Sequence, residues 1–454
     1  MKKLKRTTII IICAIIALIF FALILVFLSL GKNSGSFTSL SLPSSEEMQQ
    51  RGHVELISQE SNRATYLNKD GTKSLYLFSS PVFTDDGKEI DHSITEIQDQ
   101  ELKNRGFTYQ NTCNSVSAYF PDSLEDRYFL LADKSTQLKV SVKGNKNGGQ
   151  SVDRITTVWG RETDALTYRS TAGHDPLYAY PSQFGFTLEA SAQPERAHEF
   201  YISLDHCIAD ASSPEYIIFR HKKTEKVLAI AYAPVMRTKD GGIAIGNISV
   251  SETNGSTYTI RSGFDALSSG DFPDENARCA VSIHLYVPKQ PDTTVYENTP
   301  EVNNYLSQFM FTGRQNERGQ SQTYVRFEQL DSLDLAGKDI VSASYYVHSM
   351  DPSSKTALAA YPAVDDWCSF AVDWTIKARP DPSIRVKPKV LDSGDLAFDI
   401  TKFVRLWLDN RGDDNAVYSV RNGMVLINSD PSSREVLAAN DSGIYGTVLV
   451  INYK

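Results

Sequence analysis

Three observations predict an all-β protein, in which antiparallel β-sandwich (jelly-roll-like) domains follow an N-terminal transmembrane helix. The first is an uncharged apolar run close to the N-terminus. The second is a period-two alternation of apolar and polar residues over many short segments, which is typical of half-buried strands. The third is the regular recurrence of turn signals, such as Asn254-Gly255 and Asn422-Gly423, between those segments. Short strands separated in this way favour antiparallel sandwiches.

The size and composition of the chain set its class. At 454 residues it is long enough for two or three domains, and 41% hydrophobic with 22% charged residues describes a folding chain. The net charge is -9. Four cations lie in residues 1–6, so the remaining 42 basic and 55 acidic residues leave the rest of the chain at -13. An acidic body argues against nucleic acid as a partner, because binding phosphates requires a basic surface.

The N-terminal apolar run predicts a membrane anchor. Residues 7–30 contain no charged side chain, and as a helix they would extend about 36 Å, enough to cross a bilayer. A cleavable signal peptide has an apolar core of only roughly 7–15 residues, so an uncleaved signal anchor is favoured over cleavage near Gly31. The basic residues 1–6 then stay in the cytoplasm. We therefore expect a single-pass protein of the cell membrane, with its bulk outside the cell.

The rest of the chain divides by composition. Residues 31–45 form a linker rich in Ser and Gly. Residues 46–290 are expected to be an N-terminal β region, in two lobes if the polar stretch 144–151 separates them. The proline-rich stretch 287–300 marks the main boundary, and residues 291–454 form the C-terminal domain.

Alternation places the strands within these two regions. In the N-terminal region it predicts strands at 74–79, 137–143, 200–204, 216–219, 227–233, 258–261 and 280–287. In the C-terminal domain it predicts them at 324–328, 341–347, 396–400, 424–427 and 447–453.

One short helix is predicted at residues 401–409. Its spacing puts Phe403, Leu406 and Trp407 on one face, and Asp399 or Thr401 can cap its N-terminus. We expect this helix to close one end of a sandwich.

Three segments of the C-terminal domain, in order, resemble the DNRLRE domain of bacterial surface proteins. They are residues 323–347, residues 360–374 with Trp367 and Trp374, and residues 396–453 with Trp407. Thr375 stands where that family usually has Asn, and the last strand lacks the customary preceding Pro. The resemblance implies a sandwich related to carbohydrate-binding modules on a bacterial cell surface. Residues 68–91 are similar to the N-terminal β region of wall-associated and Rhs-like proteins.

Motifs that carry catalysis are missing from the sequence. It contains no HExxH, GxSxG or Walker sequence, and its eight histidines lack metal-ligand spacing. A glycan hydrolase needs only two carboxylates, and Asp365, Asp366 and Asp373 beside two tryptophans are the candidates. The sequence favours turn positions for these aspartates and core positions for the tryptophans. We therefore predict a protein that is not an enzyme and needs no cofactor.

Exposed tyrosines are the candidate carbohydrate-binding residues. Aromatic rings stack on sugar C–H faces, while polar neighbours hydrogen-bond the hydroxyls. The candidates are Tyr345, Tyr346, Tyr361 and Tyr418. Because strand side chains alternate, one of the adjacent pair Tyr345 and Tyr346 must face inward, and the sequence does not decide which.

Two further features leave alternatives open. The loop 409–415 offers Asp409, Asp413 and Asp414 as Ca²⁺ ligands, although a solvated turn is favoured. Outside the membrane span lie four cysteines, which could form disulfides in any of three pairings or stay free thiols: Cys113, Cys207, Cys279 and Cys368.

These inferences predict a membrane-anchored binding or structural protein of the bacterial surface. Its expected partners are the membrane and a cell-envelope or extracellular polysaccharide. Because the part of the chain outside the membrane is acidic, it is expected to bind neutral glycans more readily than anionic ones. The first alternative is a scaffold or stalk that binds a surface protein, and the second is a glycan hydrolase with a concealed carboxylate pair.

Overall fold

The structure is a computed structural model. It describes residues 42–454 except 44, 123, 125–126, 143–148, 152–155, 160–165, 170–176, 178–183, 193–196, 265–276, 286–291, 316–317, 351–356, 392, 414–415, 431 and 441–445. The predicted cytoplasmic residues, the anchor and most of the linker therefore lie outside the described residues. Within the described part of the chain, no helix has the length and apolarity needed to span a membrane.

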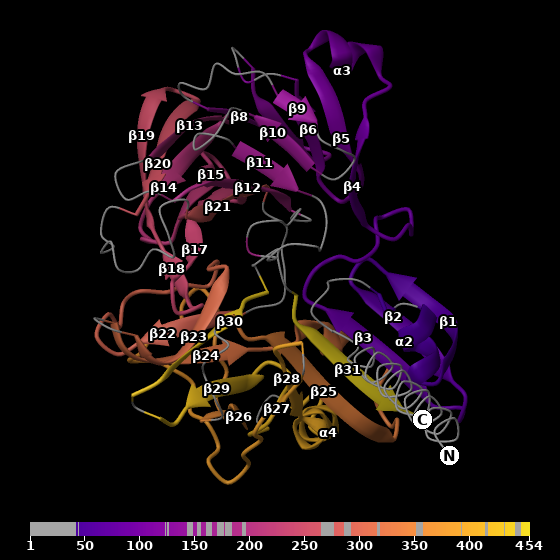
Figure 1. The fold of residues 1–454 in the computed structure, drawn as a ribbon. Helices are drawn as coiled ribbons and strands as arrows, with labels where there is room; N and C mark the ends of the chain where they lie inside the picture. The colour runs from indigo at the N-terminus through magenta and orange to yellow at the C-terminus, as the bar shows by residue number, and fades with distance from the viewer. Residues whose placement is uncertain are drawn as a thin grey trace, which may run out of the picture.

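The all-β prediction is confirmed, because four antiparallel sheets stack in pairs to form two β-sandwiches (Figure 1). In the first sandwich, an eight-stranded sheet faces a larger ten-stranded sheet. The eight-stranded sheet has the order β19 (Asn247–Asn254), β20 (Thr257–Gly263), β13 (His198–Ser203), β8 (Gln137–Val142), β7 (Phe129–Ala132), β6 (Ser117–Pro121), β5 (Phe107–Cys113) and β4 (Asp91–Glu96). The other sheet has the order β14 (Cys207–Asp210), β15 (Tyr216–His221), β16 (Val227–Tyr232), β21 (Arg278–Leu285), β12 (Gly185–Ser191), β11 (Leu166–Arg169), β10 (Thr156–Trp159) and β9 (Gly149–Ser151), with β17 (Val235–Arg237) and β18 (Ile243–Ile245) beside it.

The second sandwich pairs a seven-stranded and a six-stranded sheet. The seven-stranded sheet has the order β1 (His53–Glu60), β2 (Arg63–Asn68), β3 (Lys73–Phe78), β31 (Val448–Tyr453), β25 (Ile340–His348), β28 (Asp395–Asp399) and β27 (Lys389–Val390). The six-stranded sheet has the order β26 (Leu358–Pro362), β29 (Met424–Asn428), β24 (Gly319–Val325), β23 (Phe309–Gln315) and β30 (Arg434–Ala438), with β22 (Asp292–Tyr296) paired to β24. The short helices are α2 (Ser45–Gln50), α3 (Gln100–Asn104), the 3₁₀ helix η3 (Glu328–Ser332) and α4 (Thr401–Asp409).

The first three strands of the described residues belong to the sheet that also contains their last strand. β3 pairs antiparallel with β31, from Lys73 opposite Tyr453 to Phe78 opposite Val448. The division expected from the sequence placed residues 46–290 in one region, whereas this pairing puts β1, β2 and β3 in the second sandwich. Alternation locates a strand but does not reveal its partner, which here lies at the other end of the chain.

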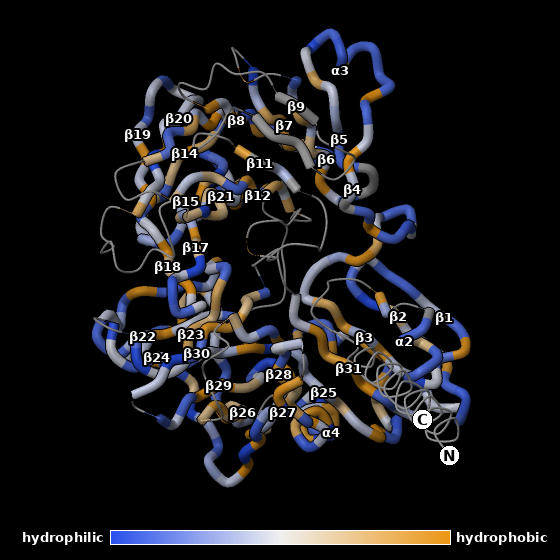
Figure 2. The backbone as a smooth tube through the Cα atoms, in the orientation of Figure 1, coloured by the Kyte–Doolittle hydropathy of each residue, from blue (hydrophilic) through white to orange (hydrophobic). Residues whose placement is uncertain are grey.

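Hydrophobic alternation explains where each core lies. Leu75 and Leu77 of β3 and Leu449 and Ile451 of β31 face the six-stranded sheet and are at most 3% exposed. Figure 2 shows hydrophobic residues along β3 and on α4 in this sandwich, whereas α3 at the far end of the molecule is largely hydrophilic. The predicted strands recur with small shifts at their ends. The predicted strand 324–328 is the main departure, because β24 ends at Val325 and η3 begins at Glu328.

The predicted helix at 401–409 is confirmed as α4. The N-cap position is occupied by Ile400, which makes no side-chain capping hydrogen bond, so the expected cap by Asp399 or Thr401 is wrong. The carboxylate of Asp399 accepts the backbone N–H of Thr401 at 3.1 Å just before the helix. Phe403 and Trp407 are fully buried, while Leu406 is only half-buried. The helix therefore packs against the core of the second sandwich.

A buried carboxylate joins the two sandwiches. Glu215 in the first sandwich is 6% exposed and forms an ion pair with Arg318 of the second. It also accepts hydrogen bonds from Asn304 Nδ2 at 3.3 Å and Ser307 Oγ at 2.7 Å. Because a buried charge needs partners to offset its lost hydration, these contacts hold the two sandwiches in a defined arrangement.

Candidate functional site

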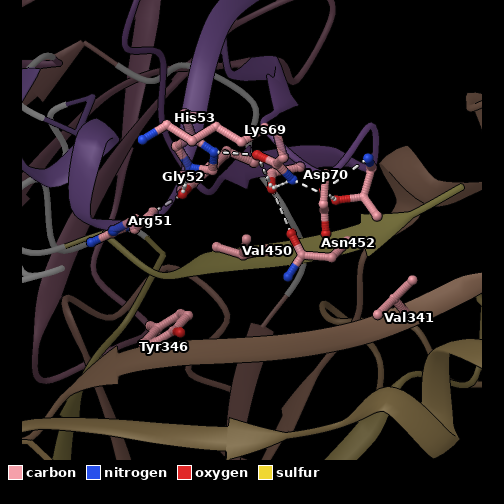
Figure 3. A pocket seen from close by; sticks show the side chains of 13 residues that line it. Arg51, Gly52, His53, Lys69, Asp70, Val341, Tyr346, Val450 and Asn452 are labelled. Carbon is pink, nitrogen blue, oxygen red and sulfur yellow. Dashed lines mark hydrogen bonds between the residues drawn. The ribbon is translucent and has the colours of Figure 1, made fainter.

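A pocket of about 560 Å³ opens on the outer face of the seven-stranded sheet (Figure 3). We call it the sheet pocket. Its floor carries Tyr76, Val450 and Asn452, which alternate along their strands with the core residues Leu75 and Ile451. Side chains from residues 51–76 thus meet side chains of the last strand in this pocket.

A helix end and a turn bring the first wall into place. After α2 the chain turns at Gly52, whose φ of 80° lies in the left-handed region that favours glycine. The carbonyl of Gly52 then accepts the backbone N–H of Lys69 at 2.9 Å. This contact places Arg51 and His53 next to the β2–β3 turn.

The turn 68–72 forms the second wall. Asp70 Oδ1 accepts the N–H of Thr72 at 3.0 Å and its hydroxyl at 2.6 Å, and Gly71 adopts a φ of 81°. These contacts are typical of a turn in which an aspartate side chain stabilises the backbone. The signal Lys69-Asp70-Gly71 therefore marked one edge of the pocket in the sequence.

A chain of hydrogen bonds runs from the first wall into the sheet. Arg51 Nη1 donates to the Tyr76 hydroxyl at 3.1 Å, and this hydroxyl lies 2.7 Å from His53 Nε2. His53 Nδ1 lies 2.5 Å from Asn68 Oδ1. Because a carboxamide oxygen can only accept, Nδ1 carries the proton. Burial lowers the pKa of His53 and so favours the neutral ring, in which Nε2 accepts from the Tyr76 hydroxyl.

The chain continues across three more strands. Asn68 Nδ2 donates to Ser74 Oγ at 2.8 Å, and Ser74 Oγ donates to Asn452 Oδ1 at 2.5 Å. Asn452 Nδ2 in turn donates to Ser342 Oγ at 2.8 Å. A connected network of this kind fixes its side-chain amides in one orientation, so the pocket offers polar groups whose positions are set before any ligand arrives.

Aromatic rings pack beneath this network. His53 stacks on Tyr66 with ring centroids 5.0 Å apart, and Tyr76 meets His53 edge-on at 5.6 Å. Burial raises the pKa of Tyr66 to about 12 and also raises the pKa of Tyr76. Both phenols stay protonated at neutral pH and act as hydrogen-bonding groups rather than anions.

The buried histidine makes stability depend on pH. Burial lowers the pKa of His53, and the neighbouring Arg51 lowers it further. In the unfolded chain, His53 has its ordinary pKa near 6.5. As the pH falls below 6.5, the unfolded state therefore binds a proton that the native state does not bind, and the native state loses stability. Between pH 7.5 and pH 5, we expect wild type to lose more unfolding free energy than His53→Gln. Denaturant titrations at both pH values measure this, and equal losses would contradict it.

The charges around the pocket are largely offset. Arg51 lies 3.6 Å from Glu47, and the exposed Lys69 and Asp70 follow each other in the β2–β3 turn. Figure 3 shows Arg51 and Tyr346 toward one end of the pocket and Asp70 and Val341 toward the other, with Val450 and Asn452 between them. Val341 is 45% exposed, so an apolar strip runs along one side opposite the polar wall.

This arrangement is suited to binding an uncharged polar ligand. Asp70 is the only carboxylate among the described residues that line the pocket, and the Thr72 hydroxyl and backbone N–H hold its pKa below the usual range. Acid–base hydrolysis of a glycoside requires two carboxyl groups, one of which is held protonated. The pocket instead combines an aromatic and aliphatic side with fixed amides and hydroxyls, as saccharide sites do.

No protein-family model matches the chain, and no curated protein matches it either. The geometry of the pocket is therefore the basis for assigning a function.

Of the four predicted glycan-binding tyrosines, the structure places one in this pocket. Tyr346 lines it, whereas Tyr345 is fully buried between the two sheets. Tyr361 lies half-buried on β26 in the other sheet. Tyr418 is half-buried and donates a hydrogen bond to Asp381. The four residues thus do not form one surface.

The structure describes two of the three predicted calcium ligands. Asp409 and Asp413 are exposed, and Asp414 lies outside the described residues. In the described part of the chain, no group of three or more His, Cys, Asp or Glu residues could hold a metal ion.

The aspartates of the hydrolase alternative have structural partners. Asp365 accepts two hydrogen bonds from the Arg379 guanidinium, at 2.7 and 2.8 Å, and Asp366 accepts the backbone N–H of Trp367. Asp373 accepts the hydroxyl and backbone N–H of Thr375. Hydrogen bonds to these partners lower the pKa of both Asp365 and Asp373. Neither carboxyl is therefore held protonated for general-acid chemistry.

The described thiols are free. Cys207 and Cys279 are buried and Cys368 is partly exposed, and burial raises the pKa of both buried thiols. The side chain of Cys113 lies outside the described residues.

Apart from Tyr346, only one edge of the pocket had a signal in the sequence. Arg51, His53, Asn68 and Asn452 carry no motif. The pairing of β1 with β2 sets His53 opposite Asn68, and the pairing of β3 with β31 brings Asn452 to them. A turn signal could identify residues 69–71 but not the opposite wall.

Proposed function

We propose that this protein is a membrane-anchored, non-enzymatic binding protein of the bacterial cell surface. Its ligand is a neutral polysaccharide of the cell envelope or of the extracellular matrix. Residues 7–30 anchor the chain in the membrane. Residues 31–45 are a linker that separates the folded part from the membrane, and the sheet pocket binds the sugar. The resemblance of residues 291–454 to DNRLRE domains supports the same class of function.

One observation carries the proposal: the sheet pocket presents a ring and an aliphatic strip opposite a wall of fixed amides and hydroxyls. Tyr346 and the exposed Val341 supply apolar surface for the C–H face of a sugar. Asn68 and Asn452 supply amide groups whose orientation the hydrogen-bond network fixes. Because the nearby charges are offset, the wall favours an uncharged ligand over an anionic one.

The length of the pocket supports an oligosaccharide. Tyr346 and Val341 are five residues apart on β25, which corresponds to about 17 Å along an extended strand. That distance is longer than one sugar ring. The ligand therefore lies along β25 with several sugar units in contact.

A retention experiment with the full-length protein in detergent tests this function. The probes are insoluble peptidoglycan and insoluble neutral polysaccharides such as cellulose and mannan, with and without Ca²⁺, and released reducing sugar is measured in parallel. We expect retention on at least one neutral polysaccharide without released sugar. Released sugar would overturn the non-enzymatic assignment, and absence of retention on every probe would overturn glycan binding.

The matched variants are Tyr346→Ala and Tyr361→Ala, since both remove a half-buried tyrosine from an outer sheet face. We expect Tyr346→Ala to weaken retention at least about tenfold, because the aromatic contact is worth about 1.4 kcal/mol or more. Tyr361→Ala should bind as wild type does. The reverse order of effects would move the site to the six-stranded sheet. Thermal melting of both variants establishes that they fold.

A further inference from the structure

The edge strand β1 is the starting point. It has eight residues and pairs with β2 on one side, and it has no neighbour on its other side among the described strands. Seven of these residues are exposed. They include Val54 at 54%, Leu56 at 39% and Ile57 at 40% exposure. Three of the nine large apolar side chains exposed in the described residues thus lie on this strand.

The opposite edge of the same sheet is protected in a way that β1 is not. β27 has only two residues, Lys389 and Val390, and Lys387 precedes it. Very short edge strands and lysines keep another chain from adding to a sheet. β1 is four times as long and contains no lysine or proline. A long edge strand with apolar side chains is a template for a further strand.

We propose that β1 pairs antiparallel with β1 of a second copy of this chain, joining two seven-stranded sheets into one. Two registers of this pairing, centred on Leu56 or on Ile57, put an apolar side chain opposite its own copy. In the register centred on Leu56, Glu55 faces Ile57 of the second copy. In the register centred on Ile57, it faces Gln59, so neither register places Glu55 opposite another glutamate. The strand is therefore compatible with itself in charge as well as in hydrophobicity.

The two bulges of β1 limit the extent of the contact. Its register with β2 shifts between His53 and Glu55 and again between Leu56 and Ser58. Bulges bend a strand, so the pairing is confined to a short stretch around Leu56. A contact of this size makes a reversible dimer rather than an obligate one.

The symmetry of this dimer has a consequence for the proposed function, on which this step rests. Two antiparallel copies of one strand are related by a two-fold axis perpendicular to the sheet, which keeps each face on the same side. Both sheet pockets therefore open on the same face of the joined sheet, because each lies beside β1 through His53. A polysaccharide can then occupy both pockets, which raises its apparent affinity without any new contact.

The oligomeric state of the full-length protein in detergent tests the pairing. Light scattering after size exclusion, over a range of protein concentrations, measures the protein mass. We expect a monomer–dimer equilibrium for wild type. Leu56→Lys and Ile57→Lys should each shift the equilibrium at least tenfold toward monomer, because both residues lie on the free edge strand. Val390→Lys, at the opposite edge, should leave it unchanged; it is the matched control, because Val390 is 53% exposed on the same sheet.

Three outcomes would overturn the proposal. A wild-type monomer at all concentrations would mean that the edge takes a strand of a different protein or none. A dimer that resists both lysine substitutions would place the contact elsewhere, for example in the anchor. An equal effect of Val390→Lys would show that added charge alone separates the copies. Thermal melting of the three variants confirms that they fold.

A second readout separates this inference from the proposed function. If both are right, Leu56→Lys weakens retention on a long polysaccharide but leaves the affinity for a short oligosaccharide unchanged. If dimers form but no sugar binds, the proposed function fails and the pairing stands. If sugar binds equally to wild type and Leu56→Lys at every ligand length, the step that links pairing to avidity fails.

Discussion

Trp407→Ala is expected to destabilise the second sandwich by about 3–5 kcal/mol, the usual range for removing a large buried aromatic side chain. Trp407 is fully buried on α4, and its ring lies 6.1 Å from the rings of both Phe327 and Phe403. The cavity left behind is lined by these rings and by sheet residues that cannot collapse into it. Denaturant unfolding measures the loss of unfolding free energy. It is followed by circular dichroism, because that signal does not depend on the fluorescence of the substituted tryptophan.

Trp407→Phe is the matched control for this prediction. The indole N–H of Trp407 is buried and has no hydrogen-bond partner in the described part of the chain. Phenylalanine keeps most of the ring contacts and removes that unpaired donor, so we expect a loss well below that of alanine. If alanine and phenylalanine cost the same, the indole would be held by a contact other than packing. An unchanged stability of Trp407→Ala would refute the core position.

Residues 292–454 expressed alone are expected not to fold cooperatively. Without β1–β3 the six-residue strand β31 becomes an edge, and the core loses Leu75 and Leu77, which pack between the sheets. An exposed apolar edge of this kind promotes aggregation. We expect an insoluble fragment, or a soluble one without a cooperative thermal transition, as measured by near-ultraviolet circular dichroism.

The control for this fragment supplies the missing strands. Residues 42–80 joined to residues 292–454 through a flexible Gly/Ser linker restore the complete seven-stranded sheet. We expect this fusion to be more soluble than the fragment and to show a cooperative transition. A fragment that melts as cooperatively as the fusion would show that residues 291–454 form an independent domain, as composition alone had suggested.

Local patterns in the sequence located many of the elements of the fold, although not β1 or β2. Period-two alternation located strands such as β3 and β31, and a 3.6-residue spacing located α4. The burial of Trp367 and Trp407 was also predictable, because large aromatic residues among alternating strands are core residues. These features depend on neighbours within a few residues, so a short stretch of sequence carries them.

The candidate site depended on contacts that no local pattern encodes. Alternation showed that one of Tyr345 and Tyr346 faces outward, but only the packing of the two sheets decided that Tyr346 does. The amides of the pocket gave no signal, since Asn68 and Asn452 are ordinary strand and turn residues until their hydrogen bonds are known.

The sequence by itself thus determined that the chain forms antiparallel strands, where many of them lie, and which face of those strands is apolar. The tertiary structure alone decided which strands pair. Ser74 and Asn452 are 378 residues apart along the chain and share a hydrogen bond across neighbouring strands. The physical reason is that alternation records only that a face is buried, and every apolar face of similar length satisfies that condition equally well. The packing of whole sheets against each other selects the partner of each strand. This packing brings the two ends of the chain together in the pocket.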